Sequence, residues 1–325
     1  MKLLRLALAA LAMAVPLAGA AQDYPSRTIR IVVPYAAGGG VDSAARVVAQ
    51  HLTTALGQNV VVDPKPGAAT VIGTEFVARA PSDGYTLLLT GGSTMSMLPL
   101  THPTKLPFDP LEDFEPVGMV SRLPFFLVTS SKQPYKSVKE LMDAARAKPE
   151  ALSYASNGTG SMGHLGTETL VQAAGAKMVH VPYAGFAPAL SDLITGRVSI
   201  VMADMASIRG QLQAGTLRPL AVASAERSRF MPDAPTLAEA GYPGAAFEIW
   251  LALYAPAKTP PDVIKRVSTE LSRFLASPQG RDAFTKLGHE ADPADGKVVR
   301  ERIVAEQKAF APAARAAGLG QAQGK

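Results

Sequence analysis

The sequence predicts an α/β protein whose chain is divided between two lobes. Two stretches more than a hundred residues apart share one order: an apolar strand, a glycine-rich turn and a helix. Strands and helices alternate around both stretches, which indicates mixed, mostly parallel sheets flanked by helices. Two long apolar segments, residues 117–129 and 247–255, are each long enough to cross between lobes as a strand.

The first of the two stretches covers residues 29–52. Residues 29–33 form a β-branched run typical of a buried strand, and apolar residues recur at helical spacing from Ala44 to Leu52. Between them, three glycines precede Asp42 and Ser43, which both favour helix starts. Such a turn presents free N–H groups and the positive end of a helix dipole. It is either an anion pocket or an ordinary strand-to-helix turn.

The same lobe continues with further strands and helices. Parallel strands end at one edge of a sheet, so the loop Gly91-Gly92-Ser93-Thr94 is expected near the first glycine turn. The predicted elements are a helix to about residue 56, a strand at 60–62, a helix at 72–80 and a strand at 85–90.

The second lobe begins with a helix that Ser137 caps, with Glu140 as its capping-box partner. A second glycine-rich turn, residues 157–164, follows the next strand. The two crossings then imply a discontinuous lobe, 22–122 plus 245–325, and a continuous lobe, 123–244. The predicted elements are helices at 137–147, 163–174, 188–195, 208–214, 237–240, 260–275 and 298–317, and strands at 152–156, 179–183, 198–203 and 217–223.

Residues 1–21 have the pattern of a secretory signal peptide. Lys2 and Arg5 form a positive start, residues 6–17 are apolar, and cleavage is expected near Ala20 or Ala21. The protein is therefore expected in the periplasm.

The overall charge decides little about the partner, although it fits an anionic small ligand. The net charge of +5 becomes +3 when the two positive residues of the signal peptide are removed, too little to predict a nucleic-acid partner. The absence of cysteine excludes disulfides, thiolate metal sites and a cysteine nucleophile.

An enzyme is the competing class, and the motifs do not favour it. Ser161 and His164 suggest a hydrolase, but the nucleophile elbow requires glycine at the position of Thr159, and no orienting acid is evident. The three glycines lack the lysine or spacing of phosphate and dinucleotide loops. His164 and Glu168 share a helix face, yet the five histidines are scattered. We therefore expect no catalysis, no metal and no cofactor.

Several motifs, in this order and spacing, resemble the periplasmic solute-binding receptors of tripartite tricarboxylate transporters, the Bug-type family. The resemblance extends from Tyr24 to about Leu319. The motifs are Tyr24-Pro25-Ser26-Arg27-Thr28-Ile29-Arg30, Tyr35-Ala36-Ala37-Gly38-Gly39-Gly40-Val41-Asp42, Pro66-Gly67-Ala68, Ala80-Pro81-Ser82-Asp83-Gly84-Tyr85-Thr86-Leu87-Leu88, His180-Val181-Pro182-Tyr183 and Leu220-Ala221-Val222-Ala223-Ser224.

The resemblance implies a two-lobed periplasmic-binding-protein fold of the Venus flytrap type, similar to type II, with the two crossing strands as its hinge. It implies a monomer that closes on a small carboxylate and delivers it to a membrane permease. A sensor that feeds a signalling partner would share the same site. The ligand residues that the resemblance implies are Tyr35, Ala37, Gly38, Gly39, Ser43, Gly92, Ser93, Thr94, Asn157, Thr159, Gly160, Ser161, His164, Tyr183 and Asp204.

Most of these residues also have an ordinary structural role open to them. Asp42 is expected to cap its helix, because an unpaired carboxylate would oppose anion binding. Gly38, Gly39 and Gly40 are expected to be needed for close approach or for their φ angles. For the other residues two roles stay open. Asn157, Thr159 and Ser161 could bind ligand or order their own turn, and His164 could contact ligand or make a structural hydrogen bond. Tyr183 could contact ligand or pack in the core, and Trp250 could stack on the ligand or pack at the core or hinge.

The chain also departs from the family pattern near the first loop. Residues 64–68 read Pro-Lys-Pro-Gly-Ala where the family has Asn-Arg-Pro-Gly-Ala, and residues 69–71 read Ala-Thr-Val where Gly-Gly-Asn is common. Tyr35 adds a hydroxyl where phenylalanine is common. These changes affect the expected contacts with the distal part of the ligand.

Overall fold

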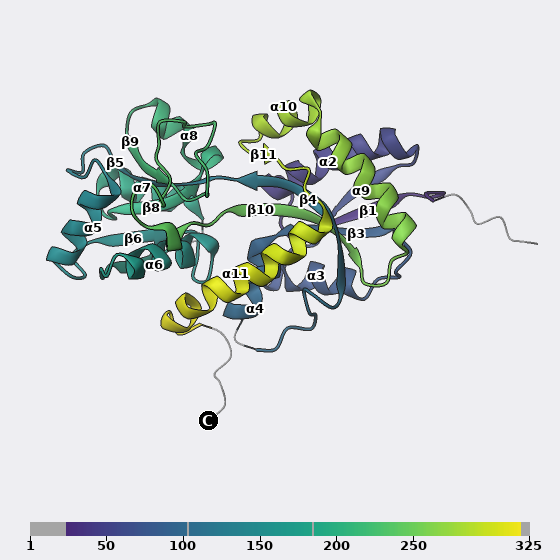
Figure 1. Cartoon of the computed structure of the whole chain (residues 1–325), viewed down its shortest axis with the longest axis horizontal. Coiled ribbons are helices and arrows are strands. Elements are labelled where there is room, and N and C mark those ends of the chain that lie inside the picture. The colour runs from purple at the N-terminus through teal and green to yellow at the C-terminus, as the bar shows by residue number, and fades with distance from the viewer. Residues whose placement is uncertain (1–23, 103, 184, 320–325) are drawn as a thin grey trace, which may run out of the picture.

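The computed structural model describes residues 24–102, 104–183 and 185–319. The predicted signal peptide lies outside these residues. The chain forms two lobes, each built on one mixed sheet and joined by extended segments (Figure 1), as predicted. Within the described ranges, no helix is long and apolar enough to span a membrane.

The first lobe contains a six-stranded sheet in the order β11-β4-β10-β3-β1-β2. β1 pairs in parallel with β2 and β3, so that Ile31 lies opposite both Val62 and Leu87. β10, β4 and β11 add antiparallel pairs. The strands are β1 (Ile29–Val33), β2 (Val60–Pro64), β3 (Thr86–Gly91), β4 (Phe114–Leu123), β10 (Ile249–Pro256) and β11 (Glu290–Ala291).

The second lobe repeats this strand order. Its sheet runs β7-β6-β8-β5-β9, which matches β2-β1-β3-β10-β4 of the first lobe. In both sheets the inserted strand, β5 or β10, pairs antiparallel with both of its neighbours, which makes each sheet mixed. The strands are β5 (Phe125–Ser130), β6 (Ser153–Ser156), β7 (Val179–Pro182), β8 (Ile200–Asp204) and β9 (Leu217–Val222).

Helices cover both faces of each sheet. On β1, Ile31 and Val33 enter one buried cluster with α2 and α9, while Val32 enters another with α3, α4 and α11. In the second lobe, α5 and α6 share a buried cluster on one face of the sheet, and α7 and α8 share a cluster on the other face. The helices are α2 (Gly40–Leu56), η1 (Ala68–Thr70), α3 (Val71–Ala78), η2 (Ser93–Met97), α4 (Leu98–Thr101), α5 (Val138–Ala147), α6 (Met162–Ala173), α7 (Phe186–Thr195), α8 (Met205–Gln213), η3 (Pro243–Ala245), α9 (Pro261–Ala276), α10 (Pro278–Lys286) and α11 (Gly296–Ala316).

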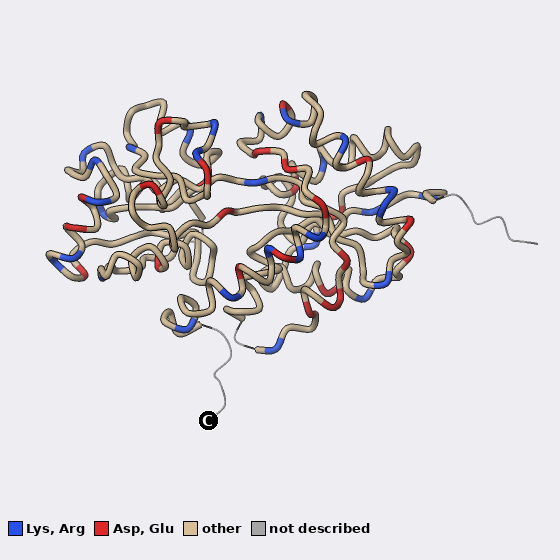
Figure 2. The backbone as a smooth tube through the Cα atoms, viewed as in Figure 1, with Lys and Arg blue, Asp and Glu red and all other residues tan. Residues whose placement is uncertain are grey.

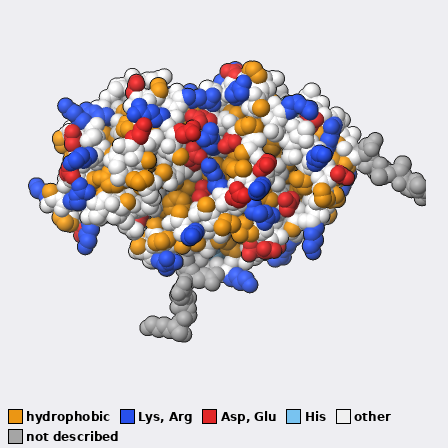
Figure 3. Space-filling model, in the orientation of Figure 1, with side chains coloured by type: hydrophobic (Ala, Val, Ile, Leu, Met, Phe, Trp, Pro, Cys, Tyr) orange, Lys and Arg blue, Asp and Glu red, His pale blue; other side chains and the backbone are white. Residues whose placement is uncertain are grey.

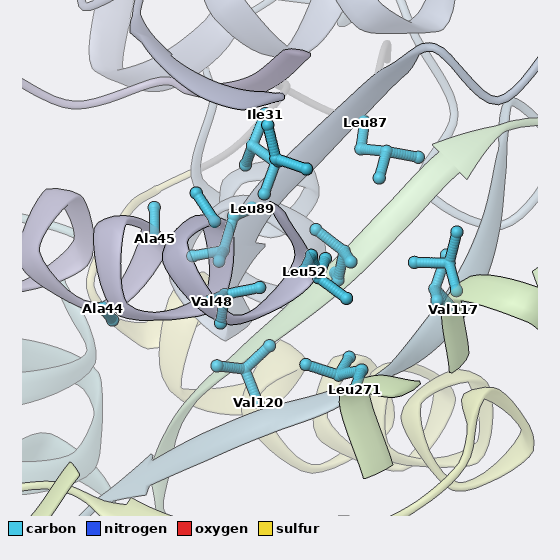
Figure 4. Close-up of a cluster of buried hydrophobic side chains, with 14 of the residues drawn as sticks. Ile31, Ala44, Ala45, Val48, Leu52, Leu87, Leu89, Val117, Val120 and Leu271 are labelled. Atoms are coloured by element: carbon cyan, nitrogen blue, oxygen red, sulfur yellow. The ribbon is translucent and has the colours of Figure 1, made fainter. Parts of the chain in front are cut away.

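The core of the first lobe fixes the direction in which α2 points. Figure 4 shows Val48 and Leu52 of α2 beside Ile31 and Leu89 of the sheet, all buried. Burying an aliphatic side chain of this size contributes about 1.5–3 kcal/mol. Because this face of α2 is held on the sheet, its N-terminus is fixed beside the carboxyl end of β1.

The crossing segments differ from the two long strands that the sequence predicts. Residues 117–129 divide into β4 and β5 at Pro124, because proline has no N–H to donate to a sheet. β10 begins only at Ile249, and Phe247 before it lies in a buried cluster of the second lobe. Each of the two segments that cross between the lobes is therefore only a few residues long.

The C-terminal helix α11 lies along both lobes (Figure 1). Val299 and Ile303 pack in the core of the first lobe. Phe310 packs in the second lobe against Phe247, with ring centroids 6.2 Å apart. The prediction that this helix only completes the first lobe misses these contacts. The sequence prediction also omits α10, β11 and the helical turns η2 and α4, and residues 237–240 form a turn instead of the predicted helix.

Candidate ligand site between the lobes

Loops from the two lobes meet at the carboxyl ends of their parallel strands. A Cβ built on Gly160, in the β6–α6 loop, would lie 3.3 Å from Cβ of Thr101 at the end of α4. A Cβ built on Gly288 would lie 3.6 Å from Cβ of Ala206 in α8. These two contacts bring the β6–α6 and β8–α8 loops of the second lobe to the boundary with the first.

The β1–α2 loop supplies one side of this boundary, and residues 36–40 are exposed. Asp42 is buried in the third position of α2, where Oδ2 accepts hydrogen bonds from the Gly38 N–H at 3.0 Å and from Arg46 Nε at 2.8 Å. The hydrogen bond from Arg46 and that from Gly38 lower the pKa of Asp42. The N-cap residue is Gly39, not Asp42, so the predicted cap is wrong in position. Asp42 instead orders the turn.

Only one of the three glycines in this loop has a backbone conformation that favours glycine. Gly38 has φ of 82°, which side chains disfavour. Gly39 has φ of −79° and ψ of 173°, and a Cβ there would meet nothing nearer than the Ala36 carbonyl oxygen at 3.6 Å. A Cβ on Gly40 would meet only His289, at 3.7 Å. The φ requirement therefore holds for Gly38 alone, and Gly39 and Gly40 leave open space over the start of α2, where close approach of a ligand stays a prediction.

Tyr35 joins a group of buried hydroxyls behind the loop. Thr90 donates to Thr94 at 2.8 Å, and Thr94 donates to Thr70 at 3.1 Å. Each hydroxyl has one hydrogen, so the 3.1 Å contact between Tyr35 and Thr94 must use the Tyr35 hydrogen. The Tyr35 oxygen therefore keeps only acceptor capacity. Thr94, predicted to touch ligand, is fully buried and positions Tyr35.

We expect Tyr35→Phe to lower the free energy of unfolding by about 1 kcal/mol, the usual contribution of one hydrogen bond. The variant leaves Thr94 without one of its two donors while preserving the packing of the ring. Urea denaturation measures the change. Tyr135→Phe is the matched control, because the Tyr135 hydroxyl makes no hydrogen bond within the described part of the chain. Equal stability of Tyr35→Phe and the wild type would contradict the assigned hydrogen bond.

The β3–η2 loop lies beside this group. Gly92 is buried, and a Cβ on it would lie 2.9 Å from Nε1 of Trp250 and 3.1 Å from Oε2 of Glu306. Ser93 is partly exposed at the start of η2. The predicted proximity of this loop to the first loop is confirmed, because Thr94 contacts Tyr35.

The β6–α6 loop of the second lobe has the same strand–glycine–helix arrangement as the β1–α2 loop, with different residues. Ser161 caps α6, its Oγ accepting from the N–H of His164 at 3.2 Å. Gly158 and Gly160 have φ of 132° and 78°, so both positions favour glycine. Asn157 and Thr159 are exposed at the tip. The side chains of Asn157 and Thr159 remain available to a ligand, and so does the hydroxyl hydrogen of Ser161, which uses only its oxygen in the cap.

Two stacked imidazoles support this loop from behind. The rings of His164 and His180 lie 3.8 Å apart, and Nδ1 of His164 accepts from the Gly160 N–H at 3.0 Å. Nε2 of His180 lies 2.8 Å from the Ser156 hydroxyl. Burial lowers the pKa of His164, and burial with the charge of its neighbour lowers the pKa of His180 to about 4. Both shifts favour the neutral ring, and His164 makes the structural bond that the sequence left open.

Tyr183 and Asp204 also have partners within the protein. The Tyr183 hydroxyl donates to Asp192 at 2.7 Å. Asp204 caps α8, accepting from the N–H of Ser207 at 2.9 Å. The candidate residues that stay at the surface of the boundary are therefore mostly backbone groups of the two glycine loops. In the described ranges, no cluster of three or more potential metal ligands is found.

An ionic network at the crossing segments between the lobes was not predicted from the sequence. Arg122, near the end of β4, lies 3.5 Å from Glu248, 3.8 Å from Glu290 and 3.2 Å from Asp292. Arg302 of α11 contacts Glu248 at 3.0 Å. Acidic and basic residues gather where the two lobes join (Figures 2 and 3). The sequence feature that could have indicated this network is Arg122 itself, a charged residue within a mostly apolar crossing segment.

Comparison with known proteins assigns the family. The sequence model of the tripartite tricarboxylate transporter family receptor matches residues 44–312. The chain belongs to this receptor family. The predicted family and fold are thereby confirmed, and the receptors of this family and its structural neighbours are solute-binding proteins, not enzymes.

Three similar proteins illustrate the relationship. BugT of Bordetella pertussis is 38% identical over 268 residues, which is 82% of this chain and 82% of BugT. A protein of R. palustris solved with adipate is 33% identical with a TM-score of 0.79, covering 92% of this chain and 100% of the other. MatC of Rhodopseudomonas palustris, solved with bound malate, is 28% identical with a TM-score of 0.74, covering 90% and 100%.

Proposed function

We propose that this receptor captures a small carboxylate between its lobes and delivers it to a tripartite tricarboxylate-type permease. The observation that carries the proposal is a pair of glycine-rich loops, one in each lobe and each at a helix N-terminus, with Gly160 of the second lobe against Thr101 of the first and Gly40 of the first beside His289. Residues 36–40 are exposed, and although the Gly38 N–H donates to Asp42, the N–H groups of Gly39 and Gly40 make no hydrogen bond to a side chain within the described residues. Adipate and malate in the two solved neighbours support a carboxylate as the ligand class.

Backbone donors are sufficient for this task without an arginine. Hydrogen bonds from N–H groups to a carboxylate are charge-assisted, and a helix N-terminus adds about 0.3–1 kcal/mol, up to ~2 when partly buried. Asp42 does not oppose an anion, because its carboxylate is already paired with Arg46 and Gly38. In this proposal Gly39 and Asn157 hold the ligand, Gly38 shapes the turn through its bond to Asp42, and Thr94 and His164 support the loops.

The location and partners of the receptor form part of the same proposal. Residues 1–21 direct export, cleavage occurs near Ala20 or Ala21, and the mature chain works in the periplasm as a monomer. Residues 22–122 plus 245–325 form one lobe and residues 123–244 the other, and the crossings act as the hinge. Periplasmic solute binding is the role of the family to which the chain belongs.

Thermal shift and calorimetry with L-malate, adipate, succinate and citrate test the function. Binding to the folded state raises stability by mass action, about 2.7 kcal/mol at a ligand concentration 100 times Kd. We expect at least one acid to raise the melting temperature and to give a single-site isotherm. Hydrolytic activity with no stabilisation by any organic acid would overturn the proposal. Co-purification with a sensor kinase in place of a permease would favour the sensor.

A further inference from the structure

Glu306 of α11 lies directly behind the β3–η2 loop. Its Oε1 accepts a 2.7 Å hydrogen bond from Nε1 of Trp250. A Cβ on Gly92 would lie 3.1 Å from its Oε2, so only the missing side chain of that glycine makes room for the carboxyl group. The carboxyl group therefore packs against the backbone of the loop that carries Ser93 and Thr94.

The surroundings of Glu306 leave its charge poorly compensated. Oε2 is sealed from solvent and makes no hydrogen bond of good geometry. Arg302, one turn earlier on α11, and the Ser96 hydroxyl of η2 favour the charged form, while Glu248 at the hinge opposes it. Tyr254 of β10 is fully buried and interacts with both Glu306 and Tyr35.

These groups set the titration of Glu306 near neutrality. Burial raises its pKa to about 7, against the opposing effects of Ser96, Trp250 and Arg302. A carboxylate ligand in front of Gly92 and Ser93 would add a second negative charge close to the first. Repulsion between like charges disfavours the ionised form, so a bound anion raises the pKa further.

We propose that the receptor takes up a proton at Glu306 together with its anionic ligand, with Glu306 as a positioning residue beneath the β3–η2 loop. This inference rests on the proposed function. Linkage is reciprocal: if ligand favours the protonated carboxyl group, protonation favours ligand. Affinity is therefore highest below pH 7 and falls as pH rises through the pKa values of the free and the liganded protein.

The unliganded protein provides the first test, because Trp250 is its single tryptophan and touches the titrating group. We expect tryptophan fluorescence to titrate with a midpoint near pH 7, and Glu306→Gln to abolish this transition. Glutamine keeps an oxygen for the Trp250 N–H but has no charge to gain. Glu301→Gln, at an exposed position of the same helix, is the control and should titrate like wild type. No transition between pH 6 and 8 would overturn the inference, whatever the protein binds.

Calorimetry with L-malate and adipate provides the second test. At pH 7.5, in buffers of different ionisation enthalpy, wild-type protein should take up a fraction of a proton per ligand and Glu306→Gln none. Affinity should fall by about fivefold or more from pH 6.5 to 8.5 in wild type and stay flat in Glu306→Gln. Equal proton uptake in both proteins would overturn the coupling. No binding of any acid, with the fluorescence transition intact, would instead overturn the proposed function, and the coupling with it.

Discussion

Replacing Gly39 with valine is expected to abolish the ligand-induced rise in melting temperature while the unliganded protein stays folded. The unliganded variant loses no more than about 1 kcal/mol of stability, because valine is a poorer N-cap residue than glycine. The backbone of Gly39 is extended, and a Cβ there meets only the Ala36 carbonyl oxygen, at 3.6 Å. The branched side chain would cover the N–H groups at the start of α2. Losing two charge-assisted hydrogen bonds, each worth about 1.5–3 kcal/mol, weakens binding by about a hundredfold or more.

Substitutions at two other glycines serve as controls for Gly39→Val. Gly38→Ala places a side chain at φ of 82° and should cost about 1–2 kcal/mol of stability. Gly244→Val, at an exposed position with nothing within 4 Å of its Cβ, should change neither stability nor affinity. Thermal shift with and without ligand separates the three variants. Wild-type affinity in Gly39→Val would remove the β1–α2 loop from the binding site.

Replacing Arg122 with glutamine is expected to lower the free energy of unfolding by about 2 kcal/mol. Fully buried pairs lose about 3–5 kcal/mol when one partner is removed, and surface pairs about 0–1 kcal/mol. Arg122 lies between these cases: its side chain is 32% exposed, and those of Glu248 and Asp292 are 14% and 18% exposed. The substitution leaves carboxylates of the second crossing segment and of the β11 region facing one another.

Urea denaturation of Arg122→Gln and Arg27→Gln measures this difference. Arg27 pairs with Asp83 at the surface, with 64% of its side chain exposed, and its removal should cost less than 1 kcal/mol. Under the proposed closure of the lobes, the substitution should also change ligand affinity without any contact to the ligand, because it alters the balance between open and closed forms. Equal stability losses in the two variants would refute a special role for Arg122.

Local patterns in the sequence were sufficient for most elements of the fold. The β-branched run at residues 29–33 and the helical spacing after Asp42 can each be recognised from a few neighbouring residues. The structure has β1 and α2 at these positions. The same holds for Ser137, whose predicted capping bond to Glu140 is present. α10 was missed because only Ser277 separates it from the end of α9, and β11 was missed because it has only two residues and depends on pairing with β4.

The candidate site required more than local patterns. Asp42 was predicted at a helix start, Asp204 at the ligand, and Ser161 was left open between the two roles. The structure gives each of them a backbone partner. Only the three-dimensional arrangement decides which polar groups are already satisfied and which remain free for a ligand.

The sequence by itself determined the two strand–glycine–helix units, the α/β class and the resemblance to the receptor family, because these depend on neighbours along the chain. Tertiary structure alone decided that Glu306 lies behind Gly92 and that Arg122 joins carboxylates more than a hundred residues away. The energies of such groups depend on burial and on charges brought together by folding. No pattern along the chain records those distances.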